Sequence, residues 1–274
     1  MTILQSEPKG SRGLKLLPKH EQYLDAFRRF QFLKAEHIQH LFGGNLNART
    51  LRFDLVKLLT AGYLRRIRSN RDEEYTYFPS PIRERSSLML THTNEVTWVQ
   101  LLVAVGAAKK DLEILACERR ASRTRFSVSM PNDEGVIKRR CCVPDFFYAH
   151  QDPTKSAGRD TRHFFFEITN AKPGQHWKKE NDIIQKCQMY NAYFDSGEFG
   201  HRLQKEFHLH VRNFRVIITF PTEARARNFT QIFRHKEVAY PGRFFVTWKD
   251  AYRANMWGPI FLSPKDDSLH SIRD

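Results

Sequence analysis

The sequence predicts an α+β protein of two domains: a small one of three helices and a β-hairpin, and a larger α/β one whose mixed sheet is flanked by helices. A chain of 274 residues is long enough to bury two cores. Apolar residues recur at helical spacing over residues 20–60, whereas short strand-like segments alternate with helical ones after residue 91. With 41% hydrophobic and 27% charged residues, the composition is that of a folded protein.

Changes in composition along the chain predict the domain boundaries. Residues 1–18 mix Pro, Gly, Ser and Lys, so we expect a flexible basic arm there. The first domain covers residues 19–80. Prolines and charged residues over 81–90 indicate a linker. Residues 91–265 form the second domain, and residues 266–274 form a tail.

The positive charge of the chain favours a polyanionic partner. Lysine and arginine number 45 against 30 acidic residues, which gives a formal net charge of +15. Nucleic acid is the commonest partner of such proteins. No apolar run reaches the roughly 20 residues of a membrane span, and the amino end lacks the apolar core of a signal peptide. We therefore expect a cytoplasmic protein with no membrane contact.

Cysteines and histidines give no zinc signature. The four cysteines lack Cys-x-x-Cys spacing, so neither a zinc knuckle nor a disulfide framework is predicted. Two close histidine pairs, His37 with His40 and His208 with His210, could ligate a metal or lie on half-exposed surface.

The first domain has the element order of a winged helix-turn-helix. Helical spacing predicts helices over residues 20–32 and 34–42, and a third helix capped by Asn45 or Asn47. Two short strands joined by the charged turn NRDEE follow, as in a wing. In this architecture the third helix enters the major groove of DNA.

Basic and polar residues of the third helix and the wing are the candidate DNA contacts. Leu51 and Leu55 face the core at i, i+4, which leaves polar residues on the other side of the helix. The candidates are Arg49, Thr50, Arg52 and Lys57 on the helix and Arg65, Arg66, Arg68 and Arg71 in the wing. The predicted partner is double-stranded DNA. Alternatively, the domain is structural, with solvated arginines, or the wing joins a homodimer that suits a palindromic site.

The second domain alternates helices and strands in the order α-β-β-β-α-β-α-β. A helix capped by Asn94 and running to about residue 108 is apolar nearly all round, hence buried. The later elements are strands over 112–117, 136–148 and 163–169, a helix over 177–194, a strand over 214–220, a helix over 222–235 and a strand over 244–248.

Two acidic residues lie in the apolar strands of this domain. Asp145 follows Pro144 in VPDFF, and Glu167 follows three phenylalanines in FFFEIT. Hydrolysis of phosphodiesters with Mg²⁺ or Mn²⁺ needs carboxylates to hold the metal and usually a lysine beside them. The two residues match the PD-(D/E)xK pattern of metal-dependent nucleases, except that Thr169 stands where the lysine belongs.

Other residues could complete the site. Lys186 shares a helix face with Tyr190 at i, i+4, and Lys172 follows the third strand. Glu95 could add a third carboxylate, although a first-turn glutamate also complements the helix dipole.

A structural interpretation of the same residues is open as well. In it Asp145 is a turn residue, Glu167 pairs with Arg139 or Arg140, and the helix lysines form a basic surface.

The order of several segments resembles the replication-relaxation family of plasmids and other mobile elements, over roughly residues 20–265. These segments are LRFDLVKLLTAGYLRR, YTYFPS, LTHTNEV, VPDFFYAH, FFFEIT, KCQMYNAYF and FRVIITFPTEARARNFTQIF. The resemblance implies a winged helix joined to a PD-(D/E)xK-like domain, with a role in replication or DNA maintenance. It implies metal positions at Asp145 and Glu167, and Lys186-x-x-x-Tyr190 looks like the family's helix.

Three functions are consistent with the sequence. The first is a DNA-binding protein whose second domain adds a nucleic-acid surface, with no cofactor. The second is a Mg²⁺- or Mn²⁺-dependent deoxyribonuclease that uses Asp145, Glu167 and Lys186. The third is a regulator that binds another replication or conjugation protein.

Overall fold

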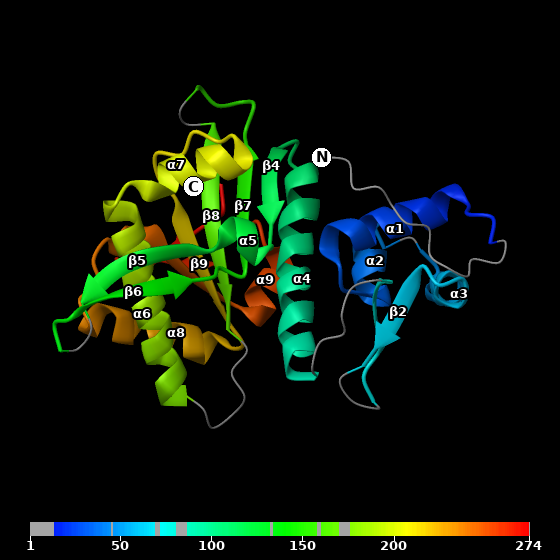
Figure 1. Cartoon of the computed structure of the whole chain (residues 1–274), viewed down its shortest axis with the longest axis horizontal. Helices are drawn as coiled ribbons and strands as arrows, with labels where there is room; N and C mark the ends of the chain where they lie inside the picture. The colour runs from blue at the N-terminus through cyan, green and yellow to red at the C-terminus, as the bar shows by residue number, and fades with distance from the viewer. Residues whose placement is uncertain are drawn as a thin grey trace. The chain divides into compact units, whose positions relative to one another are not determined.

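The computed structural model describes residues 14–44, 46–68, 72–80, 87–131, 134–157, 160–169 and 176–273, without the side chains of 87, 88 and 176–181. The chain forms two compact units, Met1–Leu101 and Leu102–Asp274. Figure 1 shows the elements of both units, coloured from the amino to the carboxyl terminus. No helix in the described ranges is long and apolar enough to cross a membrane.

The N-terminal unit combines helices with a small antiparallel sheet. Its elements are α1 (Pro18–Phe30), β1 (Leu33–Lys34), α2 (Ala35–Leu41), α3 (Ala48–Thr60), β2 (Leu64–Ile67) and β3 (Thr76–Pro79). The strand order is β1-β3-β2. The three expected helices and the hairpin are present, and β1 is an additional strand that pairs with β3.

The apolar faces of these helices are buried, as the spacing of their apolar residues predicted. Phe27, Ile38, Leu51 and Leu55 are fully buried. The cap of α3 is Asn47, whose side chain accepts hydrogen bonds from the main-chain N–H groups of residues 49 and 50 at 2.9 and 3.2 Å. This cap ends the preceding turn and fixes where α3 begins.

A buried carboxylate links α3 to α1. Asp54 is 1% exposed, and its oxygens lie 2.6 Å from Lys19 Nζ and 3.4 Å from His20 Nε2. Burial opposes its ionisation, but the hydrogen bonds and charges of Lys19 and His20 outweigh burial and hold the pKa of Asp54 below its ordinary value. The charged group therefore orients α3 against α1.

Asp54→Asn is expected to lower the free energy of unfolding of the N-terminal unit by about 2 kcal/mol, because a buried charge-assisted contact is lost. Urea denaturation combined with hydrogen exchange of the α1 and α3 amides measures the loss. The control is Asp25→Asn, which removes an exposed ion pair with Arg28 and should have little effect. Equal effects of the two variants would contradict the role of Asp54.

The long helix α4 (Ser87–Ala108) begins earlier than expected. Residues 87–90, which the sequence analysis placed in the linker, form its first turn, and residues 81–86 lie outside the described ranges. Asn94 is therefore not a cap: it is buried inside the helix, and its Nδ2 donates to Thr76 Oγ1 at 3.0 Å. Because this hydrogen bond to β3 satisfies its polar side chain, Asn94 can lie inside the helix instead of capping it.

The second unit is built on a seven-stranded mixed sheet with the order β12-β11-β10-β9-β8-β7-β4. Its strands are β4 (Glu113–Glu118), β7 (Phe146–Gln151), β8 (Thr161–Ile168), β9 (Arg215–Phe220), β10 (Phe244–Trp248), β11 (Phe261–Leu262) and β12 (Leu269–His270). Strands β8, β9 and β10 are parallel, and the other pairs are antiparallel. The predicted mixed sheet with flanking helices is confirmed.

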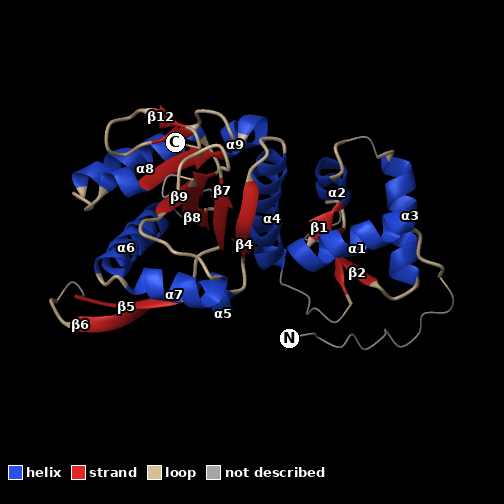
Figure 2. Ribbon diagram, turned by 90° about the horizontal axis from the view of Figure 1, so that it is seen from above, coloured by secondary structure: helices blue, strands red, loops and turns tan. Residues whose placement is uncertain are grey.

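Three helices cover one side of this sheet: α6 (His176–Asp195), α7 (Glu198–Phe207) and α8 (Glu223–His235). Figure 2 shows them gathered around the strands. Phe147, Phe165 and Val216 share this face and pack in one core with Ile184 and Tyr190 of α6. The packing fixes which side of α6 faces the sheet.

The strand expected over residues 136–148 is in fact two strands in different sheets. Strand β6 (Ile137–Cys142) pairs with β5 (Phe126–Pro131) in a separate hairpin, and the chain enters the main sheet only at β7. The break falls at residues 143–145. Pro144 has no N–H to donate, so the ladder ends there.

Further elements were not predicted. These are the short helix α5 (Ala121–Thr124), the 3-10 helix η1 (Pro241–Arg243), α9 (Lys249–Asn255), β5, α7, β11 and β12. Within the expected tail over 266–274, residues 269–270 form β12, which pairs with β11 in the main sheet.

Candidate active site

Asp145 lies at the junction where the chain joins the main sheet. Its N–H donates to the carbonyl of Phe166 at 3.0 Å, and its Oδ2 accepts the N–H of Ile168 at 2.6 Å. Ile168 lies two residues beyond Phe166, the last β8 residue paired with β7. The carboxylate thus accepts an N–H of β8 beyond the last residue paired with β7, and this contact holds the side chain at the carboxyl end of β8.

Glu167 is buried on β8 and is held by two side chains of α6. The carboxylate is 3% exposed. Tyr190 donates its hydroxyl to Oε1 at 2.8 Å, and Lys186 Nζ forms an ion pair with Oε2. Lys186 and Tyr190 are one helical turn apart, so the same face of α6 delivers both. We call Asp145, Glu167, Lys186 and Tyr190 the carboxylate–lysine cluster.

The charges of the cluster act on one another. Burial raises the pKa of Glu167 to about 7, helped by the nearby charge of Asp145 and opposed by Lys186. Burial lowers the pKa of Lys186, but the charges of Glu167 and Asp145 outweigh it, so this pKa lies above its ordinary value. Lys186 is therefore a cation at neutral pH, beside a carboxyl group that loses its proton near neutrality.

The position of the missing lysine has a structural role. Thr169 donates its hydroxyl to the carbonyl of Thr219 at 2.8 Å, and its N–H donates to the same oxygen at 3.0 Å. Both contacts tie the end of β8 to β9. The lysine that contacts Glu167 comes from α6 instead, and it is Lys186, one of the two candidates that the sequence offered.

The alternative arginine partners for Glu167 are wrong. Arg140 donates to Gln185 Oε1 at 2.9 Å, and Glu167 is paired with Lys186. The hairpin contributes Cys142, which sequence reasoning missed: its Sγ lies 4.0 Å from Glu167 Oε1, and burial raises its pKa. Cys142 is therefore a neutral neighbour of the carboxylate.

The described structure tests neither Glu95 nor Lys172 as a further member of the cluster. Glu95 belongs to the N-terminal unit, whereas Asp145 and Glu167 belong to the second. Lys172 lies outside the described ranges. Within those ranges no three His, Cys, Asp or Glu side chains are grouped so as to hold a metal.

Two carboxylates are nevertheless a donor set that suits a hard divalent cation. Mg²⁺ commonly takes one or two carboxylates and keeps several waters or substrate oxygens. The charge of Asp145 contributes to the raised pKa of Glu167, and a cation would relieve that repulsion. Asp145 and Glu167 would hold it.

The histidine pair of the N-terminal unit has a packing role. The rings of His37 and His40 lie 4.5 and 5.6 Å from the ring of Trp98, and His37 Nδ1 accepts the N–H of Lys34 at 3.1 Å. A ring fixed in this way is part of the core.

The candidate DNA contacts of α3 lie mainly on its exposed side. Arg49, Thr50 and Arg52 are exposed, and Arg52 pairs with Glu74 at 3.2 Å. Lys57 is half-buried, with Nζ 4.5 Å from the ring centre of Phe53, itself 61% exposed.

Two candidate arginines of the β2–β3 hairpin lie near an aromatic ring. The guanidinium groups of Arg66 and Arg68 lie 4.2 and 5.0 Å from the ring centre of Tyr75. Arg65 is exposed, and Arg71 lies outside the described ranges. Stacking on Tyr75 restricts two of the arginines without neutralising them.

Neither the protein-family models nor the curated proteins contain a match to the chain. The crystal structure of protein VC1899 from Vibrio cholerae is similar over 86% of this chain, at 10% sequence identity and a TM-score of 0.26. The chain spans 47% of that protein. A TM-score this low does not establish a shared fold.

Proposed function

We propose that the protein binds double-stranded DNA through an N-terminal winged helix-turn-helix. The observation that carries this proposal is the exposed basic side of α3, with Arg49, Thr50 and Arg52 near its amino end. Such residues reach base edges and phosphates when a helix enters the major groove. The ion pair of Arg52 with Glu74 is exposed, so it costs little to exchange for a phosphate.

This proposal includes a role in replication or DNA maintenance of a mobile element, supported by the resemblance to the replication-relaxation family. The formal net charge of +15 agrees with a nucleic-acid partner. The second unit would then act on or near the DNA that the first unit binds.

Binding should weaken steeply with salt, because phosphate contacts release counterions. Fluorescence anisotropy with a labelled duplex over a salt series measures the slope. Arg49→Ala is expected to weaken binding about tenfold, as a lost charge-assisted contact does. The matched control is Arg28→Ala on α1, which should bind as the wild type does. Binding that is absent, or unchanged by salt, would refute the proposal.

A second candidate function, metal-dependent DNA cleavage, is favoured by the contact of Lys186 with Glu167. This contact places a lysine at the carboxylate pair of the α/β unit, where the motif position itself holds a threonine. Mg²⁺ or Mn²⁺, when bound, would polarise the phosphodiester and lower the pKa of a water. Lys186 would donate from Nζ to a phosphate oxygen, while Tyr190 keeps the Glu167 carboxylate in place. Nicking of supercoiled plasmid, lost on chelation, is the expected result.

A further inference from the structure

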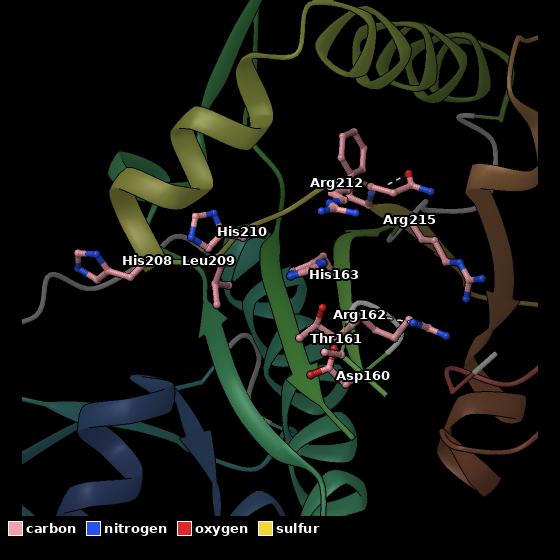
Figure 3. Close-up of a pocket in the computed structure, with 12 residues that line it drawn as sticks. Asp160, Thr161, Arg162, His163, His208, Leu209, His210, Arg212 and Arg215 are labelled. Atoms are coloured by element: carbon pink, nitrogen blue, oxygen red, sulfur yellow. Dashed lines mark hydrogen bonds between the residues drawn. The ribbon is translucent and has the colours of Figure 1, made fainter. Parts of the chain in front are cut away.

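A pocket of about 680 Å³ at the amino ends of β8 and β9 gathers no single ligand. Its wall consists of the start of β8 with the loop before it and the segment that links α7 to β9 (Figure 3). Arg162 and Arg215 point away from Arg212 and His210 in this view. The guanidinium of Arg215 lies 5.1 Å from the ring centre of Phe245. Charges that point apart do not converge on one group, so this pocket does not select a ligand.

A smaller pocket, of about 300 Å³, lies between the β5–β6 hairpin and α6. We call it the hairpin pocket. Its wall combines two cations, two amides and an apolar surface: Arg140, Lys236, Gln185, Gln188, Met130 and Ile184. The described part of this wall contains no acidic side chain. The hairpin pocket therefore favours an anionic group that also has polar and apolar parts.

The pleat of β6 turns alternate side chains toward α6. Phe126 and Val128 of β5 are buried in the core of the second unit, and their partners across the hairpin are Cys142 and Arg140. Directly opposite residues of an antiparallel pair lie on the same face, so Cys142 and Arg140 face α6. Arg139 lies on the opposite face of the strand and is exposed. Of these two neighbouring arginines, only Arg140 lines the hairpin pocket.

Two connections place the hairpin pocket beside the carboxylate–lysine cluster. Along β6, Cys142 follows Arg140 on the same face, and its Sγ lies 4.0 Å from Glu167 Oε1. Two residues of a strand span roughly 7 Å. Along α6, Gln185 directly precedes Lys186, the residue that pairs with Glu167. Both walls of the pocket therefore lead to the same carboxylate.

Arg140 is oriented without being neutralised. Its Nη1 donates to Gln185 Oε1 at 2.9 Å. A neutral amide fixes the direction of the guanidinium but leaves its charge, and its other N–H groups can bind a ligand. Lys236 is exposed and approaches from the end of α8, a different element. The two cations can therefore contact an extended anion at two points.

We propose that the hairpin pocket binds one nucleotide of a single DNA strand, next to the phosphodiester on which the carboxylate–lysine cluster would act. This inference rests on the second candidate function and names its substrate class. Arg140 and Lys236 contact phosphate oxygens of the strand. The volume is at the lower end of the range of ligand sites, so the pocket admits a nucleotide of a single strand and excludes a duplex.

The other lining residues suit a base. Gln185 and Gln188 carry amides, which can donate to and accept from the edge of a base. Met130 and Ile184 offer an apolar surface to its ring. An acidic peptide would satisfy the two cations but would leave these groups without matching partners, and the adjoining carboxylates suit a metal-bound phosphodiester.

Fluorescence anisotropy of the full chain with a labelled single-stranded oligonucleotide, in EDTA, tests the proposal without requiring cleavage. Arg140→Gln should weaken binding about tenfold, as the loss of a charge-assisted hydrogen bond does. The slope of log affinity against log salt should also fall by about 0.7, the value for one phosphate contact on a single strand. Lys236→Gln, on another element, should weaken binding about threefold.

Arg139→Gln is the matched control, because it removes the same charge from the next residue of the same strand but on the opposite face. It should change affinity by less than about twofold. Equal weakening by Arg139→Gln and Arg140→Gln would show that only net charge matters and would overturn the proposal. Absence of strand binding by the wild type, displacement of the strand by polyglutamate at equal charge, or wild-type affinity in folded Arg140→Gln and Lys236→Gln variants would also overturn it.

The results separate this inference from the functions on which it depends. The winged helix is tested with Arg49→Ala on duplex DNA, and cleavage is tested as nicking with metal. A wild type that nicks no DNA but binds the strand through Arg140 would remove the cleavage function and keep the hairpin pocket. Cleavage that requires Asp145, together with strand binding that ignores Arg140, would keep the cluster and remove the pocket.

Discussion

Asp145→Asn is expected to reduce the proposed metal-dependent DNA cleavage at least about a hundredfold, the size of effect seen when one electrostatic contact to a transition state is lost. Asparagine keeps an oxygen that can accept the N–H of Ile168, the contact that Asp145 Oδ2 makes at 2.6 Å. The junction before β7 should therefore stay intact while the negative charge disappears. The loss would then report on the charge and not on the fold.

Lys186→Met is the companion variant. It removes the cation beside Glu167 but keeps an unbranched side chain on α6. Cleavage should fall by a similar factor, since the lysine is the donor that Thr169 cannot supply. Lys205→Met on the exposed side of α7 is the matched control. Nicking rates are measured with plasmid and Mg²⁺ or Mn²⁺ for all four proteins.

Two outcomes would remove the cleavage proposal. Equal nicking by wild type and Asp145→Asn would assign the activity to something other than the cluster. Complete inactivity of the wild type across duplex, single-stranded and supercoiled DNA with either metal would leave Lys186 and Tyr190 with a structural role, holding α6 against Glu167.

The sequence predicted the elements whose pattern is local. Leu51 and Leu55 recur at i, i+4, and α3 buries both. The segment FFFEIT predicted strand β8, because a short run of aromatic residues indicates a buried strand from the local sequence alone. Phe126, Val128 and Met130 of β5 alternate with serines, a signal of period two that would have revealed the hairpin.

Features set by tertiary contacts could not be predicted in this way. The spacing of Lys186 and Tyr190 fixed their shared face, but only the packing of Ile184 and Tyr190 on the sheet turns that face toward Glu167. The pocket at the start of β8 depends on the path of the segment between α7 and β9. His208 and His210 lie there in a loop and not in a strand, so their spacing in the sequence carried no information about the cavity.

The second large effect expected is a loss of stability of the C-terminal unit as pH rises from about 5 to 8. Glu167 has a folded-state pKa of about 7 and an ordinary value of 4.5, so the folded protein holds a proton that the unfolded chain has already released. The stability that comes from this proton is fully present below pH 4.5 and is lost as pH rises through 7. The difference corresponds to about 3 kcal/mol.

Glu167→Gln should remove this dependence, because glutamine stays neutral at every pH and its oxygen can still accept the hydroxyl of Tyr190. Urea denaturation at a series of pH values, with hydrogen exchange of the β8 amides, follows the C-terminal unit alone.

The control is Glu118→Gln. Burial opposes ionisation of Glu118, but Arg120 and Arg123 outweigh it and hold its pKa below the ordinary value. The stabilisation that ionised Glu118 provides is therefore present at neutral pH and is lost in acid. Its pH dependence has the opposite sign to that of Glu167. A variant Glu167→Gln that kept the wild-type decline between pH 5 and 8 would show that Lys186 holds Glu167 ionised throughout, and that burial is the weaker influence on this carboxylate.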